Sequence, residues 1–138
     1  MTDPKRLDRQ ARARARSEKG RRAHRAGHWA EYIALVHLML KGYRILGFRL
    51  KLPQGEIDIL AQRGKRLAVV EVKQRRTHEE AWESVSDVQQ DRLWESALSL
   101  QASRPQLRAL DLGIDLYTIA PGRWPQHRLN AFEQNERL

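Results

Sequence analysis

Acidic residues and a lysine stand at strand spacing in two neighbouring segments of the chain. Glu56 and Asp58 alternate with isoleucines, and Glu71 and Lys73 alternate with valines, with Glu71 thirteen residues after Asp58. Side chains of a strand point alternately to its two faces. We therefore expect Glu56 and Asp58 on one face of the first strand with the intervening isoleucines opposite, and Glu71 and Lys73 together on one face of the second. A glycine-containing connection at residues 63–66 predicts a hairpin, and one register of it sets Asp58 next to Glu71.

The chemistry that such a cluster favours is metal-assisted hydrolysis of a phosphodiester. Two neighbouring carboxylates repel each other unless a cation lies between them, and acids in a core sheet need a compensating charge. One or two Mg²⁺ or Mn²⁺ ions would supply it, because hard cations prefer oxygen ligands. Lys73 would then orient or deprotonate an attacking water, or stabilise charge on a phosphate. An alternative of equal weight is an exposed sheet face with Glu–Lys cross-strand pairs, each contributing roughly 0.2–1 kcal/mol.

Apolar periodicity and turn residues predict the elements that position these side chains. A helix is expected from about His28 to Lys41, and a second helix is expected to begin at a Ser86 cap. Strands are expected at residues 43–51, 56–62, 67–74 and 110–120, with a fifth at an edge over 126–132. The order α-β-β-β-α-β-β predicts an α/β fold, in which a central mixed sheet is flanked by helices.

Length, charge and cysteine content limit the classes of protein. The 138 residues suffice for one core, and the absence of cysteine excludes disulfides and thiolate-bound metals. Of the net charge of +9, most lies in residues 1–26, which hold ten Lys or Arg and three Asp or Glu. We expect residues 1–26 to form a basic, flexible tail and residues 27–138 to form the domain. Such a tail either attracts phosphate backbones or is simply a solvated extension.

No apolar run reaches the length of a membrane span, and the N-terminus lacks the apolar segment of a signal peptide. We therefore expect a cytoplasmic protein that does not associate with a membrane.

From Gly27 to about Ala131 the chain resembles the YraN-type family of uncharacterised bacterial proteins. That family is similar to the PD-(D/E)XK nuclease superfamily, and especially to its archaeal Holliday-junction resolvase branch. The residues that carry the resemblance are segments 27–31, 41–45, 55–59 and 70–73, together with Val85, Ser86, Gln90, Arg92, Leu93 and Asp115.

The resemblance implies a restriction-endonuclease-like core with Asp58 and Glu71 as metal ligands and Lys73 as a catalytic residue. Glu31 matches the helix-borne acid that joins the metal site of the resolvases. From the residues alone, Glu31 could instead complement the dipole of its helix, but the site role is favoured because the helix is otherwise apolar around it. Glu56 is expected at the rim of the site or behind its ligands.

Other site residues follow from the second helix and from the end of the third strand. Gln90 matches a position expected to contact substrate or the attacking water. The chain departs from the family beside it, because Gln89 stands where a lysine is usual and Asp91 where a basic residue is common. Arg75 and Arg76 are expected either to contact phosphates or to lie in a solvated loop. Trp82, Trp94 and Trp124 are more typical of a core or an interface than of base stacking.

These observations predict a metal-dependent endonuclease acting on nucleic acid, with DNA expected rather than RNA and branched DNA as one candidate substrate. A homodimer is a further possibility, because the resolvase branch acts as dimers. One alternative is a non-catalytic nucleic-acid-binding module that retains the fold, and another is a protein-interaction domain without a nucleic-acid role.

Overall fold

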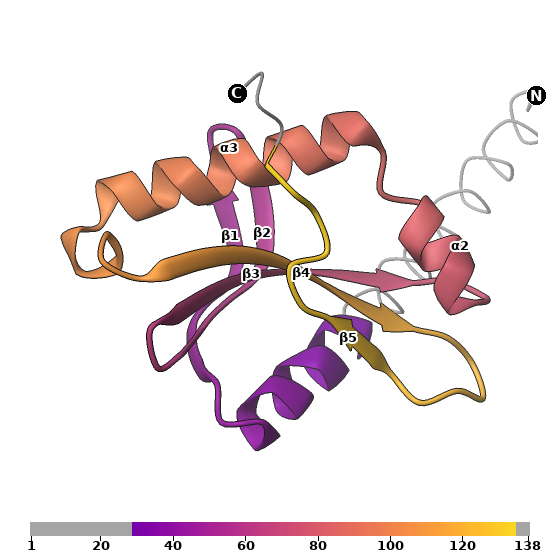
Figure 1. Ribbon diagram of the computed structural model, residues 1–138. Helices are drawn as coiled ribbons and strands as arrows, with labels where there is room; N and C mark the ends of the chain where they lie inside the picture. Colours follow the sequence, from indigo (N-terminus) through magenta and orange to yellow (C-terminus); the bar gives the residue numbers. More distant parts are fainter. Residues whose placement is uncertain (1–28, 135–138) are drawn as a thin grey trace, which may run out of the picture.

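Five strands form one mixed sheet in the computed structural model, which describes residues 29–134 (Figure 1). The sheet order is β1-β2-β3-β4-β5, with β3 and β4 parallel and the other neighbours antiparallel. The strands are β1 (Arg44–Leu52), β2 (Gly55–Arg63), β3 (Arg66–Gln74), β4 (Asp111–Ile119) and β5 (Gln126–Arg128). A parallel pair needs a long crossover connection. Here it consists of α2 (His78–Glu83), α3 (Asp87–Ser103) and the short 3-10 helix η1 (Pro105–Leu107).

Helices cover both faces of the sheet. The first helix, which includes residues 29–40, lies on one face and α3 lies on the other (Figure 1). Ala30, Ala34 and Leu38 recur every four residues on the first helix and are buried against the sheet. Small residues at this spacing let the helix approach the strands closely. The two resulting cores sandwich the sheet, so the buried apolar residues of the strands belong to one core or the other.

The alternation of β3 decides which face holds the acidic cluster. Leu67 and Val69 pack in the core under α3, whereas Val70 and Val72 pack in the core under the first helix. Glu71 has the parity of Leu67 and Val69, and it therefore faces α3 together with the next residue but one, Lys73. The predicted separation of this pair from the valines is confirmed.

The alternation predicted for β2 is wrong at its start. Ile57 packs under α3 and Ile59 under the first helix, so the two isoleucines do not share a face. The reason is that β2 pairs with β3 only from Ile59 onward, while residues 55–57 pair with β1 alone. Arg49, on β1 beside this point, has a φ of 51°, which is left-handed and unusual for a residue other than glycine. The β1–β2 hairpin twists away from β3 here, so residues of the same parity before and after Asp58 face opposite sides of the sheet.

The predicted element order and α/β class are confirmed, in an arrangement consistent with a restriction-endonuclease-like core. Ser86 caps α3 as predicted, because its hydroxyl accepts a hydrogen bond from the backbone N–H of Gln89 at 3.2 Å. The sequence did not predict α2 or η1, and the edge strand β5 is shorter than expected. The predicted tail at residues 1–26 lies outside the described residues. Within residues 29–134, no helix has the length and apolar character needed to cross a membrane.

A buried carboxylate joins the last three strands. Asp115, fully buried in β4, accepts hydrogen bonds from both terminal nitrogens of Arg66 at 2.5 and 2.8 Å and pairs with His127 Nε2 at 2.7 Å. The backbone N–H of Asn130 donates to it at 2.9 Å. Burial by itself would raise the pKa of Asp115, but hydrogen bonds from His127 and Arg66 outweigh it and leave the pKa lowered. This saturated network gives the Asp115 motif residue a structural role.

Candidate active site

A pocket of about 450 Å³ lies between the sheet and the beginning of α3. The strands contribute Glu56, Asp58 and Glu71 to its wall, and the side of α3 contributes Ser86, Val88, Gln89, Arg92, Leu93 and Ser96. The predicted hairpin therefore brings the acids together, and α3 encloses them from above.

Asp58 and Glu71 form the acidic centre of the pocket. The register sets Ile59 opposite Val70, so the next step along the hairpin brings Asp58 against Glu71. Asp58 Oδ2 accepts a hydrogen bond from the backbone N–H of Val72 at 2.8 Å, which fixes the carboxylate. Burial and then the charge of Glu71 raise the pKa of Asp58 to about 8. Burial also raises the pKa of Glu71. Near neutral pH the pair therefore retains a proton.

Glu71 has two further side-chain partners. Lys73 Nζ lies 3.3 Å from Glu71 Oε1, and Gln89 Nε2 donates a hydrogen bond to the same oxygen at 3.2 Å. The Lys73 side chain keeps 17% of its surface exposed, so its ammonium group is in contact with both the buried acid and solvent. The predicted grouping of Asp58, Glu71 and Lys73 is present in the fold.

Glu31 approaches the same site from the first helix but is held by an arginine. Its charge contributes to the raised pKa of both Asp58 and Glu71. Arg49 Nε donates a hydrogen bond to Glu31 Oε2 at 2.6 Å, and the guanidinium lies 4.5 Å from the centre of the Phe48 ring. Among residues 29–134, no three His, Asp or Glu side chains form a group arranged to hold a metal ion. The three-acid ligand set predicted with Glu31 is thus not assembled in this structure.

The remaining pair still fits a hard divalent cation. Mg²⁺ is commonly bound by one or two carboxylates, keeps several waters and takes further oxygen ligands from a substrate phosphate. Asp58 and Glu71 provide such oxygens at adjacent positions, and the proton they retain marks a place where added positive charge is favourable. Asp58 and Glu71 would therefore be the residues that hold the ion.

Gln90 lies away from the acids. Its amide donates a hydrogen bond to the backbone carbonyl of Val85 at 3.1 Å, and Gln89 contacts Glu71 in its place. The predicted role of Gln90 in contacting substrate stays a prediction that this geometry does not favour. Sequence reasoning missed the contribution of Gln89 and Ser96 to the pocket. The recurrence of Ser86, Gln89 and Ser96 at intervals near one or two helical turns could have indicated it.

The predicted peripheral residues lie outside the acidic centre. Glu56 is exposed on the rim of the pocket, in agreement with the position expected for it. Arg75 and Arg76 are exposed directly after β3, and the Arg75 guanidinium donates to the backbone carbonyl of Gln74 at 2.7 Å. Phosphate contacts by these two arginines stay a prediction.

The fold and the site together define an α/β protein in which a twisted hairpin presents paired acids and a lysine beneath a helix. Residues 30–118 match the uncharacterised protein family UPF0102, and the chain belongs to this family. A UPF0102 protein of Caulobacter vibrioides is 53% identical over 120 residues, covering 87% of this chain and 96% of the relative. A UPF0102 protein of Maricaulis maris is 44% identical over 112 residues, covering 81% and 88%. The YraN-type resemblance is thereby confirmed.

Proposed function

We propose that this protein is a Mg²⁺- or Mn²⁺-dependent endonuclease that hydrolyses phosphodiester bonds in nucleic acid, with its site at Asp58, Glu71 and Lys73. One observation carries the proposal: two adjacent, largely buried carboxyl groups line one pocket, and the ammonium group of a lysine lies 3.3 Å from one of them. Ordinary cross-strand pairs on an exposed face would leave both acids solvated. Here Glu71 is only 6% exposed, and perturbed acids in a cleft are typical of functional sites.

Each side chain has a distinct task in this proposal. The bound cation would polarise the phosphoryl group and lower the pKa of a coordinated water. The Val72 N–H holds Asp58 in one orientation, and Lys73 and Gln89 hold Glu71. Lys73 has a long, flexible stem and could turn from Glu71 to an incoming phosphate, where its ammonium would stabilise developing negative charge or orient the attacking water.

Charge supports nucleic acid as the substrate. The chain carries a net charge of +9, and Arg92 lines the pocket itself. Lysine and arginine near phosphates give affinity by displacing condensed counterions. The preference for DNA, the branched substrate and the homodimer rest on the family resemblance and are part of the proposal.

Cleavage of a substrate panel tests the proposal. Purified protein with Mg²⁺ or Mn²⁺ is expected to cut at least one single-stranded, flapped or branched substrate. Asp58→Ala and Lys73→Ala should each lower the cleavage rate by about 100-fold or more, since loss of one transition-state contact in such sites has effects of that order. Asp111→Ala, which removes an exposed acid at the far end of β4, should leave the rate within twofold. Failure to cut any member of a broad panel, or equal rates in Asp58→Ala, would contradict the proposal.

A non-catalytic nucleic-acid-binding module is the second candidate. It is favoured by Gln89, which occupies a place where the resembled family usually has lysine, and by Asp91 beside it. It predicts salt-dependent binding that survives Lys73→Ala, falls on deletion of residues 1–26 and is accompanied by no cleavage. Binding and cleavage measured on the same preparations separate the two candidates.

A further inference from the structure

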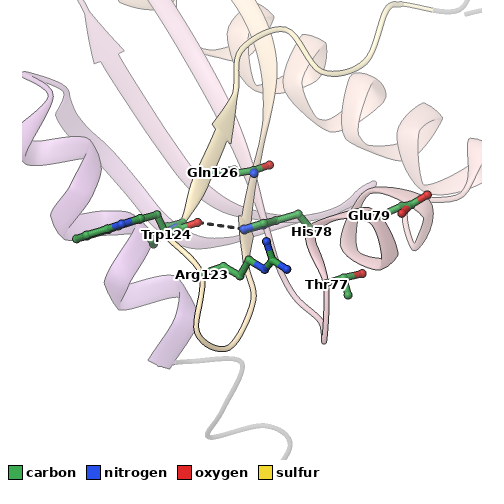
Figure 2. A pocket seen from close by; sticks show the side chains of 7 residues that line it. Thr77, His78, Glu79, Arg123, Trp124 and Gln126 are labelled. Carbon is green, nitrogen blue, oxygen red and sulfur yellow. Dashed lines mark hydrogen bonds between the residues drawn. The ribbon is translucent and has the colours of Figure 1, made fainter.

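A second pocket, of about 470 Å³, lies between α2 and the loop that joins β4 to β5 (Figure 2). It is on the same side of the sheet as the acidic site, because His78 in its wall contacts the hydroxyl of Thr118, which has the parity of Leu116 in the core under α3. In the sheet register, Lys73 in β3 pairs with Thr118 in β4, and Thr118 pairs with Gln126 at the edge of the pocket. The second pocket therefore lies two strands across the sheet from Lys73.

The loop that forms this pocket is braced. His78 contacts the Thr118 hydroxyl at 2.7 Å through Nδ1 and the backbone carbonyl of Trp124 at 3.0 Å through Nε2, as Figure 2 shows for the second contact. At the start of the loop, the backbone N–H of Arg123 donates to the carbonyl of Ala120 at 3.3 Å. The side chains of Arg123 and Trp124 are thus presented from a loop tied to α2 at its middle.

Trp124 is the most exposed large apolar side chain among the described residues, at 88%. The sequence favoured a core or interface position for it, and the structure places it outside both cores. An indole left in solvent contributes none of its large apolar surface to the core, whereas a ligand stacked on it would cover that surface. In Figure 2 the Arg123 guanidinium points into the space between His78 and Thr77, while Trp124 extends on the opposite side of the loop.

We propose that this loop binds an unstacked nucleotide in a single-stranded part of the substrate, with its base on Trp124 and a neighbouring phosphate at Arg123. The inference rests on the proposed function for the identity of the polymer. An indole face stacks on any base, and a guanidinium matches the geometry of phosphate oxygens. Glu79, on the α2 side of the pocket, is a negative charge that opposes phosphate binding. Arg75 and Arg76 add positive charge directly after β3, at the same end of the sheet.

Binding measured without divalent cations tests this subsite apart from cleavage. A fluorescent single-stranded DNA oligonucleotide is compared with one of equal length in which a central run of nucleotides is abasic, both in EDTA. Trp124→Ala is expected to weaken binding of the natural strand about 10-fold, as stacking of one base typically contributes 1–3 kcal/mol, and to leave the abasic strand unchanged. Trp124→Phe should restore most of the affinity. Leu129→Ala, which removes another exposed apolar side chain, should change neither.

Arg123→Ala gives the complementary result. It should weaken natural and abasic strands equally and reduce the salt dependence by about one phosphate contact. Equal affinity of Trp124→Ala and wild type for the natural strand, or equal losses on both strands, would overturn the stacking subsite. If that occurs while Mg²⁺-dependent cleavage is still abolished by Asp58→Ala, the inference fails and the proposed function stands. If the stacking difference is present but no substrate is cleaved, the stacking subsite stands and the proposed endonuclease function fails. If the protein binds no nucleic acid, both the subsite and the proposed function are overturned.

Discussion

The carboxyl group of Asp58 ionises less readily than that of an ordinary aspartate. Burial opposes its ionisation first, and the neighbouring carboxylate of Glu71 opposes it further, so that its pKa rises to about 8. In the unfolded chain the same group would titrate near the reference value of about 3.9. Between these two values the folded state binds more protons than the unfolded state. The free energy of unfolding therefore falls as the pH rises through this window.

We predict that Asp58→Asn reduces this pH dependence. In EDTA, wild-type protein should lose stability between pH 5 and pH 8, because the folded acid pair keeps a proton that the unfolded chain has already released. The variant should lose less over the same range and be the more stable protein at pH 8. Chemical denaturation at several pH values provides the measurement, with Asp111→Asn as the exposed control. Parallel pH profiles of wild type and Asp58→Asn would show that the pair does not retain a proton.

The central residues of the site could be predicted from sequence, and their neighbour on α3 could not. Asp58, Glu71 and Lys73 follow from a period of two and one short hairpin, which leave few registers to choose from. Gln90 and Gln89 differ by about 100° around a helix. Which of them points to Glu71 depends on how α3 is rotated against the sheet, and that depends on tertiary packing. The position of the Glu31 carboxylate likewise depends on its hydrogen bond from Arg49. No local sequence pattern indicated the left-handed backbone of Arg49.

The attachment of three neighbouring strands depends on the ion pair between Arg66 and Asp115 and on the contact of Asp115 with His127. Arg66 begins β3, Asp115 lies in the middle of β4, and His127 lies in the edge strand β5. The edge strand has only three residues, so its attachment relies on side chains as well as on backbone pairing. Asp115 is fully buried, and removing one partner would leave a charge without compensation.

We predict that Arg66→Ala lowers the free energy of unfolding by about 3 kcal/mol or more, the effect typical of breaking a buried pair. Lys65→Ala, the adjacent exposed residue in the turn, should change it by less than about 0.5 kcal/mol. Urea denaturation at pH 7 measures both. Because the pKa of Asp115 is lowered in the fold, the difference should be present above about pH 4 and shrink as the pH falls below it. Similar stabilities of the two variants would contradict a structural role for the pair.

The elements themselves were predictable where their pattern is long. The first helix and α3 have apolar faces that extend over several turns, and four of the strands have clear turn residues at their ends. By contrast, α2 has six residues with one fully buried side chain, Ala81, so it carries too little periodicity to be recognised. The exchange of faces within β2 was unpredictable for another reason. A period of two holds only while a strand keeps the same neighbours, and β2 loses β3 at Asp58.

At the scale of the whole molecule, one face of the sheet is filled by core packing and the other carries the pockets. The first helix covers one side with close packing of small residues, while α3 and α2 leave two pockets on the other. A strand of nucleic acid lying across that side would meet Asp58 and Glu71 under α3, and then the braced loop of Arg123 and Trp124, which lies two strands from β3. This arrangement places positive charge and an aromatic surface on the same side of the sheet as the paired acids, as the proposed function requires.

Calorimetric titration with Mn²⁺ at pH 7, repeated in buffers of different ionisation enthalpy, tests the central claim most directly. If Asp58 and Glu71 hold the ion, wild type should bind one or two Mn²⁺ and release up to one proton, because metal binding displaces the proton that the pair retains. Asp58→Asn should abolish both signals, and Asp111→Asn should keep them. Absence of Mn²⁺ binding by wild type, or equal binding and proton release by Asp58→Asn, would contradict the account.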